Sequence, residues 1–189
     1  MAQTIRSLRT AYDGWLKVQI AEIETGSGAL AKREVIERGE AVAVLPYDPE
    51  RRTAILVRQP RAPVQIAIGA ESILEAIAGV VEEESFEETA RREALEEAGL
   101  ALRLLEPVAV AFTSPGFTTE RIGLYLAPYT ISDRVGEGGG VAEEHEEIEV
   151  VELPLERLAT LADSGGVQDA KTLAMIQTLR LRRPDLFGG

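Results

Sequence analysis

The chain has 189 residues, 45% of them hydrophobic, which is enough to bury one substantial core and fits a single α/β domain with at most a small appendage. A formal charge of −12 argues against nucleic-acid binding, which needs basic residues to displace counterions from phosphates. Because cysteine is absent, disulfides, thiolate zinc sites and cysteine nucleophiles are excluded. Since Met1–Thr10 has no apolar core of a signal peptide and no apolar run is long enough to span a membrane, we expect a cytoplasmic protein without a membrane partner.

Two hairpins are predicted in the N-terminal part of the chain. Residues 15–23 alternate like a strand, and a turn at 25–28 precedes a second strand at 33–37, so these segments indicate an N-terminal hairpin. Segments 41–47 and 53–59 are apolar, rich in β-branched residues and separated by an Asp-Pro-Glu-Arg turn. They predict a hairpin inside the main sheet.

A helix is predicted after the apolar stretch 73–81. The sequence Ser85-Phe86-Glu87-Glu88 has the form of a capping box, in which the serine accepts from backbone N–H groups and the second glutamate reaches back. We expect the helix to begin at about Phe86, to continue through good helix formers to Ala98, and to end at Gly99, a natural left-handed cap.

The C-terminal part of the chain predicts strands, a loop and two helices. Two strands, 102–112 and 122–129, flank a Ser-Pro-Gly turn, and the glycine-rich acidic segment 132–147 indicates a mobile loop. A strand at 148–153, a short helix that begins at Pro154 and a closing helix at 169–181 follow.

Acidic residues cluster on the predicted helix. Successive helical residues turn by about 100°, so Glu93 and Glu97 lie about 40° apart and Glu96 lies close beside Glu93. Phe86 and Ala90 project within about 40° of this sector, so the acids border the apolar face, where unpaired carboxylates are costly. The pattern fits a site for hard cations, whose preferred ligands are oxygens. The alternative is a solvated acidic helix with ordinary surface ion pairs.

The residue order on this helix resembles the end of the Nudix box, a highly specific motif. The segment 92–100, Arg-Glu-Ala-Leu-Glu-Glu-Ala-Gly-Leu, fits Arg-Glu-U-X-Glu-Glu-X-Gly-U, in which U is apolar. The family pattern begins with a glycine, five residues and a glutamate. Here four residues separate Gly79 from Glu84, and a spacing of five places Ser85 at the glutamate position. The box is therefore one residue short in the loop before the helix, while the helical spacing is intact.

Further segments resemble the ADP-ribose pyrophosphatase and GDP-mannose hydrolase branch of that family. In chain order they are a strand motif, a substrate loop and a mobile acidic loop: Val57–Arg61, Ser114–Glu120 and Gly140–Ile148. Pro60 departs from the branch, which has an aromatic residue there. The resemblance covers most of the chain and implies an α/β fold, the Nudix α/β/α sandwich with a mixed sheet, plus a small N-terminal β region. We expect the N-terminal β region to be residues 1–38 and the hydrolase domain to be 39–189.

The same resemblance implies roles for individual residues. The expected metal ligands, for Mg²⁺ with Mn²⁺ as a substitute, are Ala78 through its carbonyl, Glu93, Glu97 and Glu146. The expected catalytic residues are Glu144, as the general base, and Glu96, which bridges or supports the ligands. The candidate substrate contacts are Arg58, Arg61, Pro115, Glu120 and Arg121. Two or more Mg²⁺ ions can neutralise a diphosphate and lower the pKa of the attacking water, whose proton a glutamate then takes.

Some residues keep an alternative interpretation. Each candidate arginine can instead be a surface or structural residue. His145, the single histidine, reads as an exposed loop residue, since the resemblance places the base on a glutamate. Trp15 either stacks on a nucleobase or packs in the N-terminal sheet or a dimer contact.

The implied function is Mg²⁺-dependent hydrolysis of a nucleoside diphosphate sugar by a homodimer whose N-terminal region crosses to the partner. The acidic loop and Pro115 favour ADP-ribose, cleaved to AMP and ribose 5-phosphate. GDP-mannose is the alternative, because the shortened box, Arg58-Gln59 and the segment 138–141 resemble GDP-mannose hydrolases. A noncatalytic nucleotide-sugar sensor on the same fold and an enzyme for nucleoside triphosphates are further alternatives.

Overall fold

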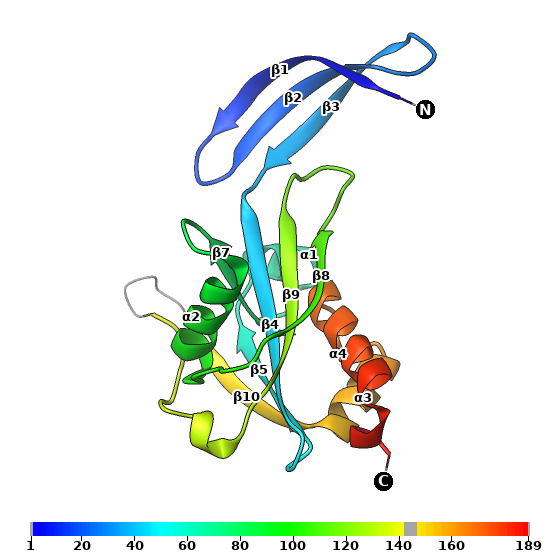
Figure 1. Ribbon diagram of the computed structural model, residues 1–189. Helices are drawn as coiled ribbons and strands as arrows, with labels where there is room; N and C mark the ends of the chain where they lie inside the picture. Colours follow the sequence, from blue (N-terminus) through cyan, green and yellow to red (C-terminus); the bar gives the residue numbers. More distant parts are fainter. Residues whose placement is uncertain (1, 142–146, 189) are drawn as a thin grey trace. The chain divides into compact units, whose positions relative to one another are not determined.

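The computed structural model describes residues 2–141 and 147–188, which fall into two compact units (Figure 1). The first unit comprises the chain up to Glu40 together with residues 111–122, and the second comprises residues 41–110 and the chain from Gly123 onward. The boundary predicted between residues 38 and 39 stays a prediction. The grouping of residues 111–122 with the N-terminal segment was not expected from the sequence.

The first unit is built on a three-stranded antiparallel sheet. Its strands are β1 (Thr4–Asp13), β2 (Lys17–Glu24) and β3 (Leu30–Glu37), in that order. Residues 113–120 join the end of β3, because the Ile36 N–H donates to the Phe117 carbonyl at 2.7 Å and the Thr119 N–H donates to the Ile36 carbonyl at 3.0 Å. The predicted β2–β3 hairpin is confirmed, whereas β1 was not predicted. Every residue of β1 is exposed, so it carries no buried stripe that a sequence pattern could reveal.

The second unit is organised around the larger, seven-stranded sheet. The strand order is β10 (Glu149–Pro154), β5 (Thr53–Gln59), β4 (Glu40–Asp48), β9 (Arg121–Pro128) and β8 (Glu106–Phe112), with β6 (Ile73–Glu75) paired to β5 and β7 (Ile77–Val81) paired to β4. The predicted β4–β5 hairpin is confirmed by the pairs Tyr47↔Ala54 and Asp48↔Thr53. Asp48 Oδ1 accepts from two N–H groups of the turn that follows, those of Glu50 and Arg51, both at 2.9 Å.

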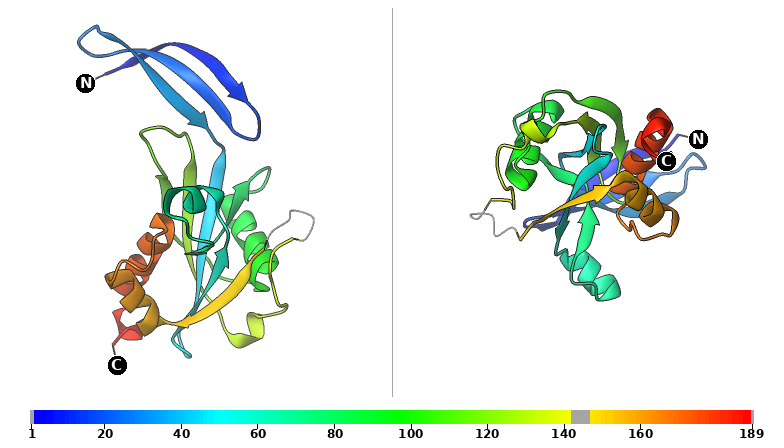
Figure 2. Two further views of the ribbon diagram at one scale, coloured as in Figure 1. Left: turned by 180° about the vertical axis from the view of Figure 1, so that it is seen from behind. Right: turned by 90° about the horizontal axis from the view of Figure 1, so that it is seen from below.

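Helices cover both faces of this sheet. Helix α2 (Phe86–Ala98) lies on one face, and α3 (Leu155–Asp163) with α4 (Ala170–Arg182) lies on the other (Figures 1 and 2). A short helix, α1 (Ala62–Ile68), follows β5 and has no buried residue. Short 3₁₀ turns occur at Ile131–Asp133 and Pro184–Leu186. Within residues 2–141 and 147–188, no helix is long and apolar enough to cross a membrane.

The two-sided covering explains the continuous apolar sequence of β4. Val42 and Val44 belong to the core cluster that includes Ala90 and Ala94 of α2. Ala43 and Leu45, which alternate with them, are also fully buried. A sheet buried on both faces needs apolar residues at every position, so the strand shows no alternation of polar and apolar side chains.

Candidate active site

The N-terminus of α2 is fixed by the predicted capping box. The Glu88 N–H donates to Ser85 Oγ at 3.3 Å, and the Ser85 N–H donates to Glu88 Oε2 at 2.9 Å. The helix ends at Gly99, whose φ of 66° is in the left-handed region that glycine adopts without strain. The predicted bounds of this helix are confirmed.

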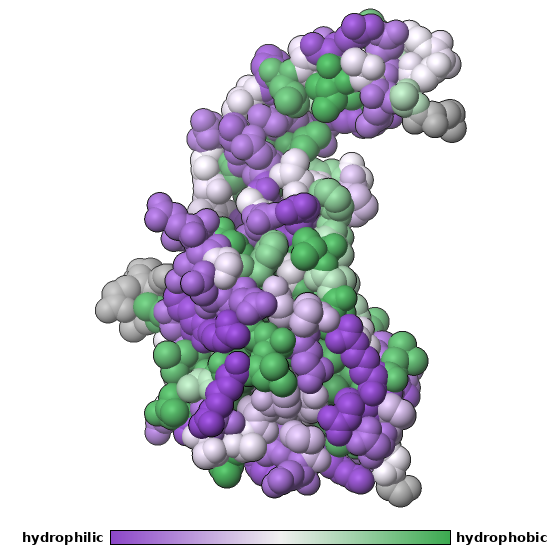
Figure 3. Space-filling model, in the orientation of Figure 1, coloured by the Kyte–Doolittle hydropathy of each residue, from purple (hydrophilic) through white to green (hydrophobic). Residues whose placement is uncertain are grey.

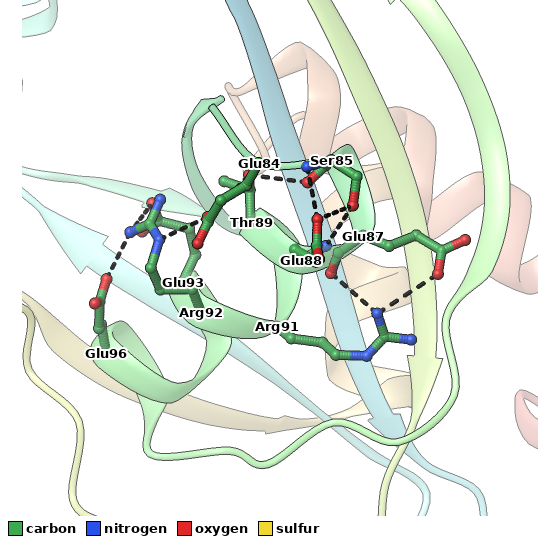
Figure 4. Close-up of polar contacts among 9 residues, drawn as sticks. All are labelled: Glu84, Ser85, Glu87, Glu88, Thr89, Arg91, Arg92, Glu93 and Glu96. Atoms are coloured by element: carbon green, nitrogen blue, oxygen red, sulfur yellow. Dashed lines mark hydrogen bonds and ion pairs between the residues drawn. The ribbon is translucent and has the colours of Figure 1, made fainter. Parts of the chain in front are cut away.

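Glu84 lies beside the helix and contacts its arginine (Figure 4). Arg92 Nε donates to Glu84 Oε2 at 3.1 Å, and Thr89 Oγ1 donates to the same oxygen at 3.4 Å. Ser85 is occupied as the helix cap. Glu84 therefore contacts Arg92 while Ser85 is used as the cap, an arrangement that favours Glu84 over Ser85 as the counterpart of the first glutamate of the motif.

Arg92 connects three of the clustered carboxylates. Besides Glu84, its Nη1 lies 2.9 Å from Glu93 Oε1 and donates to Glu96 Oε2 at 2.8 Å (Figure 4). Burial lowers the pKa of Arg92, but the hydrogen bonds and charges of these glutamates outweigh that effect and raise the pKa. One permanent cation thus fixes the directions of several anions and reduces their mutual repulsion.

The carboxylates of Glu93 and Glu97 lie against β7 at Ala78 and Gly79. A Cβ atom added to Gly79 would stand 1.8 Å from Glu93 Oε1, so the carboxylate occupies the space that a side chain would need. Glu97 is 2% exposed, and the Ala78 N–H donates to its Oε2 at 3.3 Å. The strand residues and the helix residues predicted to share a metal site are therefore neighbours.

The chemistry of these groups fits a hard divalent cation in part. Glu93 and Glu97 offer carboxylate oxygens in a largely buried setting, where bound Mg²⁺ would offset the cost of burying their charge. In the part of the chain that the structure describes, no three acidic or histidine side chains converge closely enough to form a complete cation site. Glu146, the further predicted ligand, lies outside the described residues, as do Glu144 and His145.

The glycine run after residue 135 ties the start of the predicted acidic loop to the C-terminus of α2. The Gly139 N–H donates to the Glu97 carbonyl at 2.9 Å, and the Gly140 N–H donates to the Glu96 carbonyl at 3.2 Å. At Gly138, φ is 74° and an added Cβ would stand 2.4 Å from the Glu97 carbonyl oxygen. Only glycine allows this close approach of the chain to the C-terminus of α2.

Arg61 is a predicted substrate contact whose charge interacts with this cluster. Its Nε donates to Glu75 Oε1 at 2.8 Å. Burial lowers the pKa of Arg61, but the hydrogen bond to Glu75 and the charges of Glu75, Glu97 and Asp169 outweigh it and raise the pKa. The Glu97 carboxylate therefore acts electrostatically on the Arg61 guanidinium.

Comparison with known proteins identifies the family. Residues 37–175 match the NUDIX domain. The chain is 41% identical over 152 residues to the GDP-mannose pyrophosphatase of Cronobacter sakazakii, covering 80% of this chain and 78% of the relative. It is 38% identical over 176 residues to the GDP-mannose pyrophosphatase of Pectobacterium atrosepticum, covering 90% of each.

The chain belongs to the Nudix family. A solved structure described as an ADP compounds hydrolase superposes with a TM-score of 0.80 over 98% of this chain and 96% of that chain, at 20% identity, and supports the fold alone. The predicted Nudix α/β/α sandwich with a mixed sheet and the predicted membership of a Nudix pyrophosphatase family are therefore confirmed. Nudix enzymes generally use a divalent metal such as Mg²⁺.

Three further predicted substrate contacts, Arg58, Glu120 and Arg121, form ion pairs with neighbouring side chains. Arg58 lies at the end of β5 and pairs with Glu149 at 3.3 Å, where both side chains are exposed. Pro115, Glu120 and Arg121 belong to the first unit. There Arg38 Nε donates to Glu120 Oε1 at 3.4 Å, and Arg121 pairs with Glu40.

The first unit contains an open pocket of 310 Å³. It is lined by Trp15, Leu16, Ile36, Arg38, Thr113, Ser114, Phe117, Thr118 and Glu120. Trp15 is 86% exposed, and the Arg38 guanidinium lies 4.7 Å from the centre of its ring. This cation–π contact holds the indole without covering it.

Two charged residues near the Nudix cluster were not found by sequence reasoning. Glu75 and Lys171 form an ion pair in the second unit although 96 positions separate them in the chain. Glu75 interrupts an apolar stretch, which was a visible but unspecific signal, and Lys171 lies on a predicted helix without any distinguishing pattern.

Proposed function

We propose that this Nudix enzyme hydrolyses the diphosphate of a nucleoside diphosphate sugar and that GDP-mannose is its preferred substrate. The observation that supports the chemistry is the placement of the Glu93 and Glu97 carboxylates against Ala78 and Gly79. The substrate rests on relatives at 34–41% identity that are named GDP-mannose pyrophosphatases. The preference for ADP-ribose that the sequence favours is not confirmed, so ADP-ribose becomes the competing substrate to be tested.

In this proposal Glu93, Glu97 and the Ala78 carbonyl hold Mg²⁺, for which Mn²⁺ can substitute. When bound, such ions neutralise the diphosphate and lower the pKa of the attacking water. Glu146 as a further ligand and Glu144 as the general base remain predictions from the sequence, because both lie outside the described residues.

The described residues have separate tasks in the reaction. Arg92 keeps Glu84, Glu93 and Glu96 in fixed directions, and Arg61 supplies a guanidinium for the phosphate oxygens. Water forms a bond to one phosphorus and the bridging P–O bond breaks, so GDP-mannose gives GMP and mannose 1-phosphate. The proton of the attacking water passes to the base.

The Trp15 pocket is the proposed nucleobase site. An exposed indole beside a guanidinium presents a flat surface on which a purine ring can stack. Trp15 is the single tryptophan of the chain, so its fluorescence reports on this pocket alone. Titration with GDP should quench that fluorescence, and GDP binding measured by calorimetry should be weaker in the Trp15→Leu variant. Unchanged tryptophan emission at saturating GDP would place the base elsewhere.

The substrate is tested by measuring kcat/KM for GDP-mannose and ADP-ribose with the same Mg²⁺ concentration. We expect GDP-mannose to be preferred by at least about tenfold, which corresponds to about 1.4 kcal/mol of transition-state discrimination. A tenfold preference for ADP-ribose would reverse the assignment. Tight binding of both compounds without turnover would support the noncatalytic sensor. A homodimer and a cytoplasmic location stay predictions.

A further inference from the structure

A buried carboxylate of the second unit holds the Arg61 guanidinium through both of its oxygens. Glu75, at the end of β6, is 4% exposed. It accepts from Arg61 Nε at 2.8 Å and from Arg61 Nη2 at 3.4 Å, one nitrogen on each carboxylate oxygen. A bidentate pair of this kind fixes the plane of the guanidinium as well as its position.

Lys171 anchors the same carboxylate to α4. Its Nζ donates to Glu75 Oε2 and lies 3.1 Å from Asp169 Oδ2. Asp169 is in turn the cap of α4, because its Oδ2 accepts from the Thr172 N–H at 3.0 Å. Thr172 Oγ1 accepts from the Ala76 N–H at 2.6 Å, next to Glu75 in the chain. The start of α4 therefore fixes the strand segment that carries Glu75.

The charges keep this network intact at neutral pH. Burial would raise the pKa of Glu75, but the hydrogen bond from Arg61 and the charge and hydrogen bond of Lys171 outweigh it and lower the pKa. Glu75 therefore stays ionised. Nε and Nη2 of Arg61 face Glu75, and the side chain as a whole remains 43% exposed, so a ligand can still reach it.

We propose that Glu75 is a positioning residue, which holds the Arg61 guanidinium in the orientation that meets a phosphate oxygen of the substrate. Lys171 supports Glu75 as a second cation. The effect on catalysis rests on the proposed function, but the positioning itself does not. Without Glu75, the long arginine side chain would lose its fixed orientation and part of its grip on the diphosphate.

Glu152, in the same unit, is a matched control that distinguishes positioning of Arg61 from a purely structural role of Glu75. Glu152 is a partly buried glutamate that, like Glu75, is held by several donors: it pairs with Arg51 and accepts from Thr53 Oγ1 at 2.7 Å and Tyr129 Oη at 3.2 Å. Its pKa is lowered as well, because the hydrogen bonds from Thr53 and Arg51 outweigh burial. The partners of Glu152 are not among the proposed site residues.

The kinetic test compares Glu75→Gln with Glu152→Gln. Both variants should lose some thermal stability, but only Glu75→Gln should raise the KM for GDP-mannose, by about tenfold, with a smaller change in kcat. In an Arg61→Gln background, Glu75→Gln should have no further effect on KM, because the group it positions is gone. An unchanged KM in Glu75→Gln, or additive effects in the double variant, would overturn the proposal.

Measurements without turnover separate this proposal from the substrate assignment. In ¹⁵N spectra of the full-length protein, the Arg61 Nε–Hε signal should be resolved and should broaden or shift in Glu75→Gln but not in Glu152→Gln. Inorganic pyrophosphate, titrated calorimetrically with Mg²⁺, should bind about tenfold more weakly to Glu75→Gln. Unchanged Arg61 signals and pyrophosphate affinity would reject the positioning role. Wild-type protein that binds pyrophosphate but hydrolyses no nucleotide sugar would reject the proposed function instead.

Discussion

Because Gly79 has no side chain, the Glu93 carboxylate has room to lie against the strand. The Glu93 carboxylate fills the space that a Cβ would need there, and the φ of Gly79 is not in the left-handed region, so steric space and not backbone conformation requires glycine. Gly79→Ala should therefore fold but displace Glu93. We expect kcat to fall by about 10- to 100-fold and the Mg²⁺ concentration for half-maximal activity to rise. Gly39→Ala is the control, because nothing lies within 4 Å of an added Cβ there. Wild-type kcat and Mg²⁺ dependence in Gly79→Ala would contradict this account.

Glu97 is the buried carboxylate of the cluster, and its charge can be removed with little change in volume. Glu97→Gln should lower kcat by roughly a hundredfold or more if the carboxylate holds Mg²⁺, while the circular dichroism spectrum stays that of the wild type. Glu87→Gln, on the exposed side of the same helix, should keep full activity. Near-normal Mg²⁺-dependent turnover of Glu97→Gln would remove this residue from the metal site.

At the scale of elements, α2 was predictable because its signals are local. A capping serine, a glutamate three residues later and a terminal glycine each act on the backbone within one helical turn, so they fixed both ends of the helix. The strand β1 lacks such signals, since its residues are exposed on both faces. The helix α1 was not predicted either, because none of its residues is buried and it therefore has no apolar stripe for a sequence pattern to reveal.

The candidate site shows the same division between local and long-range information. The spacing of Glu93, Glu96 and Glu97 is enough to group them, because residues three and four apart share one face of a helix. The contact of Glu75 with Lys171 depends on how α4 packs near β6, which no local pattern encodes. The place of Glu84 was left open by the shortened motif and depends on the path of the loop into the helix.

The N-terminus of α2 offers a test that separates stability from catalysis. Ser85→Ala removes the cap and should lower stability by about 1 kcal/mol, with a fall in Tm of about 2–4 °C, while kcat stays near the wild-type value. Glu84→Gln should do the opposite, because it leaves the cap but loosens Arg92 and through it Glu93 and Glu96. Measuring Tm and kcat of both variants tests whether residue 85 acts on stability and residue 84 on catalysis. A loss of kcat in Ser85→Ala larger than that in Glu84→Gln would return the first-glutamate position of the Nudix box to residue 85.

At the scale of the whole molecule, we predict that the protein forms a dimer. The prediction is based on the exposed side chains of the first unit. Four large apolar side chains of its sheet are each more than half exposed: Ile5, Leu8, Tyr12 and Leu30. Figure 3 shows hydrophobic residues on the visible surface of this sheet. Exposed apolar side chains grouped on one thin sheet are typical of a surface that another chain covers, and a second copy is the partner that the family resemblance implies.

We therefore predict that the full-length protein sediments as a dimer at micromolar concentration and that Leu8→Glu weakens the dimer at least about tenfold, because a charge would be buried without a partner. Leu181→Glu is the control. Leu181 is 84% exposed on α4 in the second unit, so a charge there should leave the sedimentation coefficient unchanged. Because the proposed nucleobase pocket lies in the same unit as Leu8, the loss of assembly should also raise the KM for GDP-mannose. A wild-type protein that sediments as a monomer with full activity would contradict this prediction.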